Sequence, residues 1–515
     1  METKTKKIGE VALYSLFALM FAFVSSQLFL QKPIRAVSDF FIELVYSEDE
    51  VTDRVLTVVY PNDVNSLEPT LFVPDVRQRL VNMYEPLVKS DENFSMEPAL
   101  ALSWGLIDEL TWEIYLRPDV VFHDGTSFEA NDVVASINRA RNYESSTLKD
   151  IVASIEKITV IDNFTLRIST EEPDPLLLQK LSQVFIIPFE YEKNEFETPV
   201  GTGPYVFSEW DPGNEMVLKR NQGYWGVDPK FLEAKLISKT DKSERVNLFL
   251  KGGADLISFV PYDAIDAIVE RGFEISSVPS LEVQFLLFNN KSSYLSDLNA
   301  RRAVSMVINP AQLAKELGGE YVKPVNQYVS TGVFGYSSAI EEHDYNPVMA
   351  EIIAWENNLE GITLKLHLQK GLDVLGEHVR KSLADIGINV VVSYLDGAEF
   401  FDSLFLGDAD IYFFGFNSDL GDSIDFLKSI VYSDGDFNVI GYKSDRVDHL
   451  IDLALTELET FRRSTALNEA MEVIVQEDYV GVPLIEYETV YATNEKIDIN
   501  PRLDGLIYFN ELIVN

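Results

Sequence analysis

An alternation of strand and helix patterns between residues 362 and 416 constrains the fold of this chain more than any other feature. Residues 362–368 (ITLKLHL) alternate apolar and polar side chains, as a half-buried strand does, and residues 376–386 carry an apolar face with helical spacing. Gly387 follows in the position of a helix-ending glycine, and residues 388–394 form a second apolar run. Two strands joined by one helix are expected to be parallel with a right-handed crossover. The chain is therefore predicted to contain an α/β sheet.

The pattern continues to a third strand and a loop. Residues 399–406 have helical spacing, and residues 411–416 (IYFFGF) form an almost wholly apolar run, which predicts a strand buried on both faces of a parallel sheet. Residues 417–422 are turn formers, and either Asp422 or Ser423 could cap the helix that follows. The whole segment is thus predicted to be a βαβαβ unit.

The loop after the third strand is the candidate ligand site. In open α/β sheets, ligands bind outside the carboxyl ends of the strands, and Asp419 lies at this place. Next to Phe416, the Asp419 carboxylate could hold the ammonium group of a ligand. Alternatively, Asp419 satisfies the backbone of the turn, as aspartate often does. This stretch by itself leaves both interpretations open.

Composition excludes several function classes. The 515 residues suffice for two or three domains, and 46% apolar with 24% charged residues is typical of a globular protein. The net charge of −41 repels phosphate backbones, so nucleic acid is not expected as a partner. A solubility role in an acidic or salty habitat explains this charge more simply than attraction of cationic ligands. The absence of cysteine excludes disulfides, thiolate metal sites and cysteine nucleophiles.

The N-terminal segment predicts a membrane location. Three lysines within the first seven residues precede an uncharged apolar run over residues 11–30, and Lys32 and Arg35 follow it. Twenty residues at helical rise span the hydrocarbon core of a bilayer, which favours an uncleaved anchor. A cleaved signal peptide is the alternative, because Ala36, Val37 and Ser38 form a passable cleavage pattern. In both cases the rest of the chain is expected on the outer face of the cytoplasmic membrane.

The sequence gives little support for an enzyme. It contains no GxSxG, HExxH, GxxxxGK[ST] or CxxC motif, and its five histidines are scattered, so no catalytic residue, metal site or cofactor is predicted. His123 lies in a turn and is expected to be structural. The glycine-rich residues 200–205 (VGTGPY) predict a tight backbone crossing rather than a phosphate loop. Arg301 and Arg302 could reach a ligand carboxylate, although a charged helix edge is the commoner explanation.

Several motifs, in order along the chain, together resemble one protein family. These motifs are residues 84–87 (YEPL), 111–126 (TWEIYLRPDVVFHDGT), 201–205 (GTGPY), 221–225 (NQGYW), 301–303 (RRA), 435–442 (GDFNVIGY) and 482–484 (VPL). With them, the chain resembles the extracellular solute-binding proteins of the peptide/nickel class, family 5, which serve ABC importers. The resemblance extends over about residues 56–515.

The resemblance implies an α/β fold of the periplasmic-binding-protein type. The implied architecture is a two-lobed clamp of type II with mixed sheets and flanking helices, preceded here by the N-terminal transmembrane helix. Two crossing segments are expected near residues 280–288 and 482–490. The implied organisation is a cytoplasmic N-terminus (1–10), a transmembrane anchor or signal segment (11–30), a linker (31–52), lobe I (53–280), lobe II (281–484) and a return to lobe I (485–515).

The resemblance also implies a binding site. In dipeptide- and oligopeptide-binding relatives, the loop that resembles residues 415–426 supplies an aspartate for the peptide α-ammonium, and Asp419 matches it. The implied ligand-binding residues are Asp419, Phe416, Asn417 and Ser418, with the main chain of residues 416–418 adding the ligand as an extra strand. Phe416 stands where these relatives usually carry Trp, and Ser423 where they often carry Pro, so the pocket is expected to differ in shape. No arginine matches the one that some relatives use for the peptide carboxylate.

The implied function is that of a monomeric, extracytoplasmic binding component of an ABC importer. Its expected partners are a small peptide or similar amine-bearing solute, a membrane permease, and the membrane itself through the N-terminal helix. The alternatives are a sensing or signalling clamp without transport, or a binder of a non-peptide solute such as a metal chelate or sugar. A hydrolase is disfavoured by the missing nucleophile motifs. The sequence does not name the solute.

Overall fold

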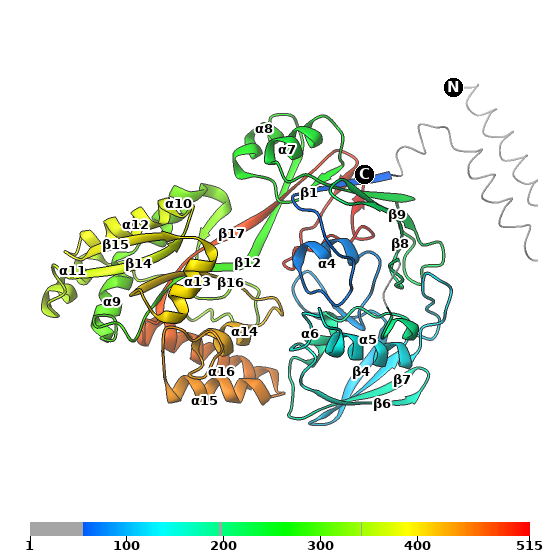
Figure 1. Ribbon diagram of the computed structural model, residues 1–515, viewed down its shortest axis with the longest axis horizontal. Helices are drawn as coiled ribbons and strands as arrows, with labels where there is room; N and C mark the ends of the chain where they lie inside the picture. Colours follow the sequence, from blue (N-terminus) through cyan, green and yellow to red (C-terminus); the bar gives the residue numbers. More distant parts are fainter. Residues whose placement is uncertain (1–54, 195–197, 341) are drawn as a thin grey trace, which may run out of the picture. The chain divides into compact units, whose positions relative to one another are not determined.

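The two longest strands in the described part of the chain lie side by side. They are β12 (Glu274–Phe288) and β17 (Gly481–Thr493), which pair antiparallel with two interruptions of the register (Figure 1). The computed structural model describes residues 55–194, 198–340 and 342–515. Residues 57–230 and 234–515 form one compact unit. The two strands belong to an 11-stranded sheet of order β15-β14-β16-β12-β17-β11-β1-β10-β9-β8, in which β13 pairs with β17.

The βαβαβ unit predicted from the sequence is confirmed. Strand β14 (Thr363–Gln369) pairs parallel with both β15 (Asn389–Leu395) and β16 (Ile411–Asn417). The connections contain α12 (Asp373–Ala384) and α13 (Gly397–Leu406). The sheet is mixed rather than parallel, because β16 pairs antiparallel with β12 on its other side.

Strand β16 (Ile411–Asn417) differs from the prediction of a strand buried on both faces. Only residues 411–413 are buried in succession, and the following residues alternate between half-buried and exposed side chains. The parallel partner β14 pairs only with Ile411 and Tyr412, so the second half of β16 extends beyond it. The apolar run therefore overstates how far the strand lies inside the sheet.

A second sheet contains four antiparallel strands. Its order is β4-β5-β7-β6, and a hairpin with its turn at Asp162 and Asn163 joins the last two strands. The helix α5 (Ala130–Asn142) covers it, because Val133 and Ile137 share one core with residues of β5 and β7. The strands are β4 (Ala101–Asp108), β5 (Thr111–Leu116), β6 (Ile155–Asp162) and β7 (Thr165–Thr170).

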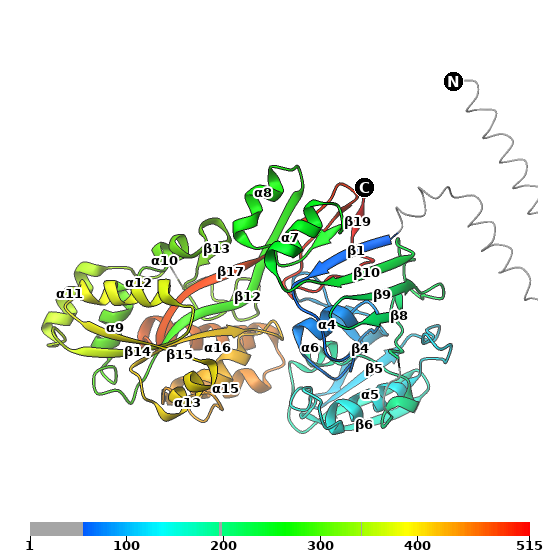
Figure 2. The same ribbon diagram turned by 45° about the horizontal axis from the view of Figure 1, so that its top comes forward.

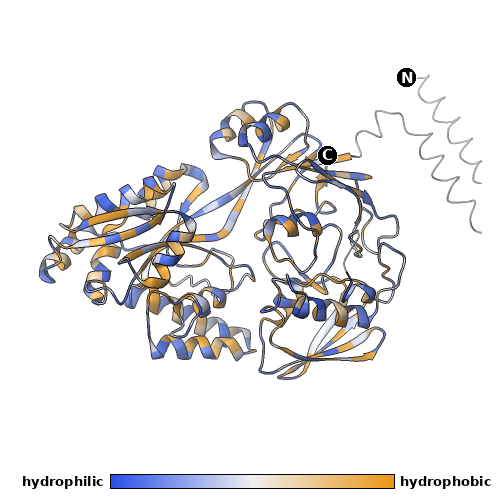
Figure 3. Cartoon of the chain, viewed as in Figure 1, coloured by the Kyte–Doolittle hydropathy of each residue, from blue (hydrophilic) through white to orange (hydrophobic). Residues whose placement is uncertain are grey.

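The remaining elements complete the 11-stranded sheet and cover it. Figure 2 shows β1, β10, β9 and β8 as successive neighbours, and Figure 3 shows polar and apolar residues alternating along the helices. The other strands are β1 (Val55–Tyr60), β2 (Val88–Ser90), β3 (Met96–Pro98), β8 (Tyr205–Asp211), β9 (Glu215–Arg220), β10 (Glu233–Ser238), β11 (Leu256–Ile257), β13 (Val322–Pro324), β18 (Ile497–Asp498) and β19 (Ile513–Val514). The other helices are α4 (Pro74–Leu80), α6 (Leu177–Ser182), α7 (Lys242–Leu250), α8 (Ile265–Val269), α9 (Leu298–Val307), α10 (Pro310–Leu317), α11 (Pro347–Glu356), α14 (Ile424–Phe426), α15 (Asp445–Thr456) and α16 (Thr460–Glu472).

Three of the motifs that carry the family resemblance meet around one carboxylate. Glu85 accepts hydrogen bonds from the Thr202 hydroxyl, the Tyr224 hydroxyl and the Trp225 indole N–H, each at 2.8 Å. Gly201 crosses the chain so closely that a Cβ atom there would lie 2.2 Å from the carbonyl oxygen of Met83. The predicted backbone crossing is thus confirmed, and these contacts stabilise the fold.

The predicted N-terminal segments at residues 1–10, 11–30 and 31–52 lie outside the described residues, as do residues 53 and 54. Over the ranges that the structure describes, no helix combines the length and the apolar run that crossing a membrane requires.

Strand β17 contains a buried carboxyl group that makes stability depend on pH. Glu486 is 5% exposed, and its Oε1 atom has no hydrogen-bond partner in the described chain. Burial raises the pKa of Glu486 from 4.5 to about 7, an effect that the Ser330 hydroxyl opposes and the Glu488 charge strengthens. Because the folded state binds this proton more tightly than the unfolded chain, the stability that it contributes is lost as pH rises from about 4.5 to about 7.

We therefore expect Glu486→Gln to stabilise the protein above pH 7 by on the order of 2 kcal/mol, and to have little effect near pH 4. Chemical unfolding followed by circular dichroism at several pH values measures this difference. The exposed Glu274 of β12 provides the control substitution Glu274→Gln. If the free energy of unfolding depends on pH equally in the wild type and in Glu486→Gln, Glu486 is not the group responsible for the pH dependence.

Candidate functional site

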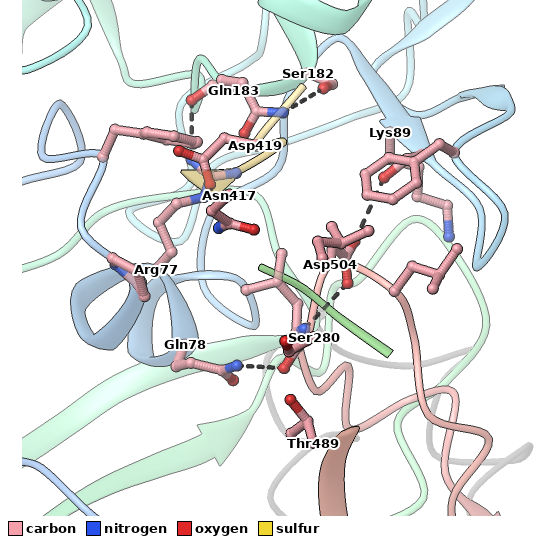
Figure 4. Close-up of a pocket in the computed structure, with 18 of the residues that line it drawn as sticks. Arg77, Gln78, Lys89, Ser182, Gln183, Ser280, Asn417, Asp419, Thr489 and Asp504 are labelled. Carbon is pink, nitrogen blue, oxygen red and sulfur yellow. Dashed lines mark hydrogen bonds between the residues drawn. The ribbon is translucent and has the colours of Figure 1, made fainter. Parts of the chain in front are cut away.

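A cavity of about 310 Å³ lies at the end of β16 (Figure 4). Its wall combines the loop after this strand with helix α4, part of β12 and the C-terminal segment. Polar side chains dominate the part of the wall that Figure 4 labels, and several aromatic rings complete it. The lining residues with polar side chains include Arg77, Gln78, Lys89, Ser182, Gln183, Glu282, Asn417, Asp419, Asp504 and Tyr508.

The structure separates the four predicted site residues into two pairs. Asn417 and Asp419 line the cavity, where the Asn417 amide donates a hydrogen bond of 2.5 Å to the Asp419 carboxylate. Ser418 is buried, with 1% exposure, and Phe416 packs edge-on against Phe426 at 5.6 Å between ring centroids. The side chains of Phe416 and Ser418 therefore support the loop, whereas those of Asn417 and Asp419 are accessible to a ligand.

The backbone of β16 offers an unpaired edge next to this loop. Beyond Tyr412, the strand is paired with β12 on one side, and no strand among the described residues pairs with its other side. Unpaired N–H and C=O groups at a strand edge can accept an extended peptide as an additional strand.

Two neighbouring features shift the pKa of Asp419 in opposite directions. Burial of the carboxylate by the cavity wall raises the pKa of Asp419, and the positive charge of Arg77 partly offsets this rise. Asp419 forms no ion pair within 4.0 Å with any residue that the structure describes. A carboxylate in this state favours the approach of a cationic group that restores its lost solvation.

The loop that carries Asp419 is fixed by a buried ion pair. Asp422 binds Arg463 of α16 through two contacts, at 2.6 and 3.0 Å, and the side chains are 1% and 5% exposed. Asp422 also accepts a hydrogen bond from the backbone N–H of Ile424, the first residue of the short helix α14. Ser423, the second alternative predicted, takes the N-cap position of this helix, without a side-chain hydrogen bond. Gly421, with a φ of 67°, packs against the ring of Phe94 so closely that a Cβ atom would lie 2.6 Å away.

Arg77 is a cavity residue that sequence reasoning missed. It is 8% exposed, and its guanidinium lies over the rings of Phe72 and Phe185, at 5.0 and 4.7 Å from their centroids. One of its nitrogens, Nη1, donates to the carbonyl of Gln183 at 3.0 Å. Because Phe185 and Gln183 lie far along the chain from helix α4, no local pattern indicates this environment.

Two residues considered from the sequence are structural. Arg301 donates hydrogen bonds to the carbonyl groups of Leu295, Ser296 and Asp478 and does not line the cavity. His123 lies next to the backbone of the glycine crossing, with its Nε2 atom 3.0 Å from the carbonyl oxygen of Gly203. Neither residue therefore contributes to the cavity.

Comparison with known proteins identifies the family. The model described as "Bacterial extracellular solute-binding proteins, family 5 Middle" matches residues 95–438. The chain belongs to family 5. This assignment confirms the resemblance that the sequence motifs indicated.

Individual family 5 relatives are more distant. The glutathione-binding protein GsiB of Salmonella paratyphi A is 25% identical over 332 residues, which cover 62% of this chain and 65% of the relative, slightly less than two thirds of its length. Solved structures match 90% of this chain. One is the periplasmic binding protein DppA from Helicobacter pylori in complex with the peptide STSA, with a TM-score of 0.72, 22% identity and 99% coverage. Another is NikA from Brucella suis in complex with Fe(III)-EDTA, with a TM-score of 0.79, 21% identity and 100% coverage. These likenesses confirm the predicted α/β periplasmic-binding-protein-like fold.

Proposed function

We propose that this protein binds a short peptide or a similar amine-bearing solute outside the cytoplasmic membrane and delivers it to the permease of an ABC importer. The observation that carries the proposal is the Asp419 carboxylate, which lines the cavity without an ion-pair partner in the described chain. Membership of family 5 supports the binding role, and the peptide in the DppA complex supports the ligand class.

Two kinds of contact would hold the ligand. The Asp419 carboxylate would pair with the ligand ammonium, while the main chain of residues 416–418, at the end of the unpaired edge, would bind the ligand main chain. Main-chain contacts do not depend on the side chains of a peptide. The charge of Asp419 would therefore select for the amine, and the strand edge would contribute affinity for many sequences.

Binding would close a clamp of two lobes. The proposed lobes are residues 53–280 together with 485–515, and residues 281–484 between them. The paired strands β12 and β17 would form the crossing, which is supported by their length and by the register shift between Pro279 and Val283. Such irregular positions can absorb the backbone rotation that hinge closure requires.

The proposed setting follows from the sequence. Residues 11–30 would anchor a monomer to the outer face of the membrane, or direct its export if they are cleaved. We propose a binding role without catalysis, which membership of family 5 supports. A metal chelate is the second candidate ligand, favoured by the buried cation Arg77 and by the Fe(III)-EDTA bound to NikA.

Native mass spectrometry tests the ligand class. The full chain, purified in detergent from cells grown on peptide-rich medium, is expected to release short peptides, and Asp419→Asn is expected to release fewer. If the protein is recovered empty, thermal-shift screening with peptide mixtures follows, since a bound ligand raises the unfolding temperature. Recovery of a metal chelate or a sugar would show that the ligand is of that class and not a peptide. The absence of stabilisation by any amine-bearing solute would contradict the proposal.

A further inference from the structure

The charged groups of the cavity leave one cation without a carboxylate partner. Among the basic residues that line it, Lys89 pairs with Glu511 at 3.1 Å, whereas Arg77 has no ion pair within the described residues. The acidic residue Asp504 is occupied by Arg502, which binds it at 2.7 Å. The unpaired cation of the wall is therefore Arg77.

Arg77 is held so that part of its guanidinium remains available. The rings of Phe72 and Phe185 fix the group by cation–π contacts, and Nη1 is used by the carbonyl of Gln183. The Nε and Nη2 atoms form no hydrogen bond with described residues, and Arg77 lines the cavity. A guanidinium fork with free N–H groups is suited to bind a carboxylate through two parallel hydrogen bonds.

Arg77 and Asp419 face each other without touching. In Figure 4 the side chain of Arg77 extends toward Asp419. Burial lowers the pKa of Arg77, and the charges of Tyr508, Asp504 and Asp419 oppose this shift, in that order. Burial raises the pKa of Asp419, and the charge of Arg77 opposes that rise. No ion pair within 4.0 Å joins them, although both line the same cavity. Two opposite charges that line the same cavity without an ion pair provide complementary contacts for a ligand group that carries one positive and one negative charge.

We propose that Arg77 and Asp419 together bind an α-amino-acid head group, in which an ammonium and a carboxylate are attached to the same carbon atom. The proposal rests on the proposed function and narrows its ligand class. Free amino acids and peptides whose first residue is a γ-linked glutamate carry such a head group. In an ordinary α-linked peptide the first carboxyl group is part of an amide, so Arg77 would be left in the wall without an anion. A buried donor or charge that loses its partner reduces affinity.

A pair of isomeric dipeptides tests this geometry. γ-Glu-Ala and α-Glu-Ala have the same composition and formal charge, and they differ only in which glutamate carboxyl forms the peptide bond. Isothermal titration calorimetry with the full chain in detergent is expected to show at least about tenfold tighter binding of the γ-linked isomer. Arg77→Met is expected to remove this preference, and Arg77→Lys to keep part of it, because lysine retains the charge without the fork.

Arg380→Met is the matched control, since it removes one positive charge from an exposed position on α12 that does not line the cavity. It is expected to leave the preference unchanged. Equal or tighter binding of α-Glu-Ala by the wild type would overturn the inference and leave the proposed binding of amines intact. Failure of both isomers to bind would also overturn the inference about the amino-acid head group. The proposed function is tested separately, by identifying the solutes that the protein retains in native mass spectrometry. An unchanged preference in both Arg77 variants would remove Arg77 from the site.

Discussion

Asp419→Asn is expected to weaken the binding of an amine-bearing ligand by several hundredfold. Once the clamp closes and excludes water, an ammonium group without its carboxylate costs about 3 to 5 kcal/mol. Asparagine keeps the size of the side chain and an oxygen that can accept the hydrogen bond from the amide of Asn417. The loss of affinity in Asp419→Asn therefore measures the contribution of the negative charge. Calorimetry with the solute recovered from the purified protein measures the effect.

A second carboxylate of the same cavity provides the control. Asp75 also lines the wall, is half-buried, and accepts hydrogen bonds from Asn62 at 3.3 and 3.5 Å. Asp75→Asn is expected to change affinity less than threefold, because Asp75 belongs to helix α4 and not to the loop that carries the proposed ammonium contact. Since burial raises the pKa of Asp419, affinity in the wild type should fall as pH decreases through that pKa, and Asp419→Asn should lack this dependence. If Asp419→Asn lowers the affinity less than tenfold, Asp419 does not bind the ammonium group of the ligand.

Local periodicity explains why the βαβαβ unit could be predicted. The alternation in residues 362–368, the helical face of 376–386 and the glycine at 387 are each encoded within a few residues, and the structure contains β14, α12 and β15 at these places. Gly387 has a φ of 75°, which glycine adopts without strain. The position of Asp419 beyond the strand end followed from the same local pattern.

The division of the site residues into two pairs could have been predicted from the same alternation. Side chains two residues apart along an extended chain point to one side. Phe416 and Ser418 share the packed side, and Asn417 and Asp419 share the cavity side. The sequence prediction treated these four residues as one group because it considered the loop and not the direction of each side chain.

Contacts between distant segments could not be predicted in this way. The rings and carbonyl group that hold Arg77 come from Phe72, Phe185 and Gln183, and the last two lie more than one hundred positions along the chain. Nothing near Arg77 in the sequence distinguishes it from other arginines on amphipathic helices. Only the folded arrangement shows which cation faces the cavity.

The loop that carries Asp419 depends on a second long-range contact, so Arg463→Met is expected to lower both stability and affinity. It leaves the carboxylate of Asp422 buried at 1% exposure without its two contacts, which is expected to cost about 3 to 5 kcal/mol of the free energy of unfolding. Arg463 also donates to the carbonyl of Ala454 at 2.9 Å, so the connection between α16 and α15 is weakened as well. Urea unfolding followed by tryptophan fluorescence measures the loss.

An exposed ion pair between α15 and α16 provides the control that separates the effect of burial from the effect of charge. Arg446 binds Glu469 and Glu477, each at 2.9 Å, with about half of its side chain exposed, and Arg446→Met is expected to cost less than about 1 kcal/mol. Adding Asp422→Asn to Arg463→Met removes the unpaired charge and is expected to recover part of the stability. If affinity recovers together with stability in this double variant, the ion pair acts on the ligand by fixing the loop of Asp419. Equal losses in Arg463→Met and Arg446→Met would show that burial of the Asp422 pair does not stabilise this loop.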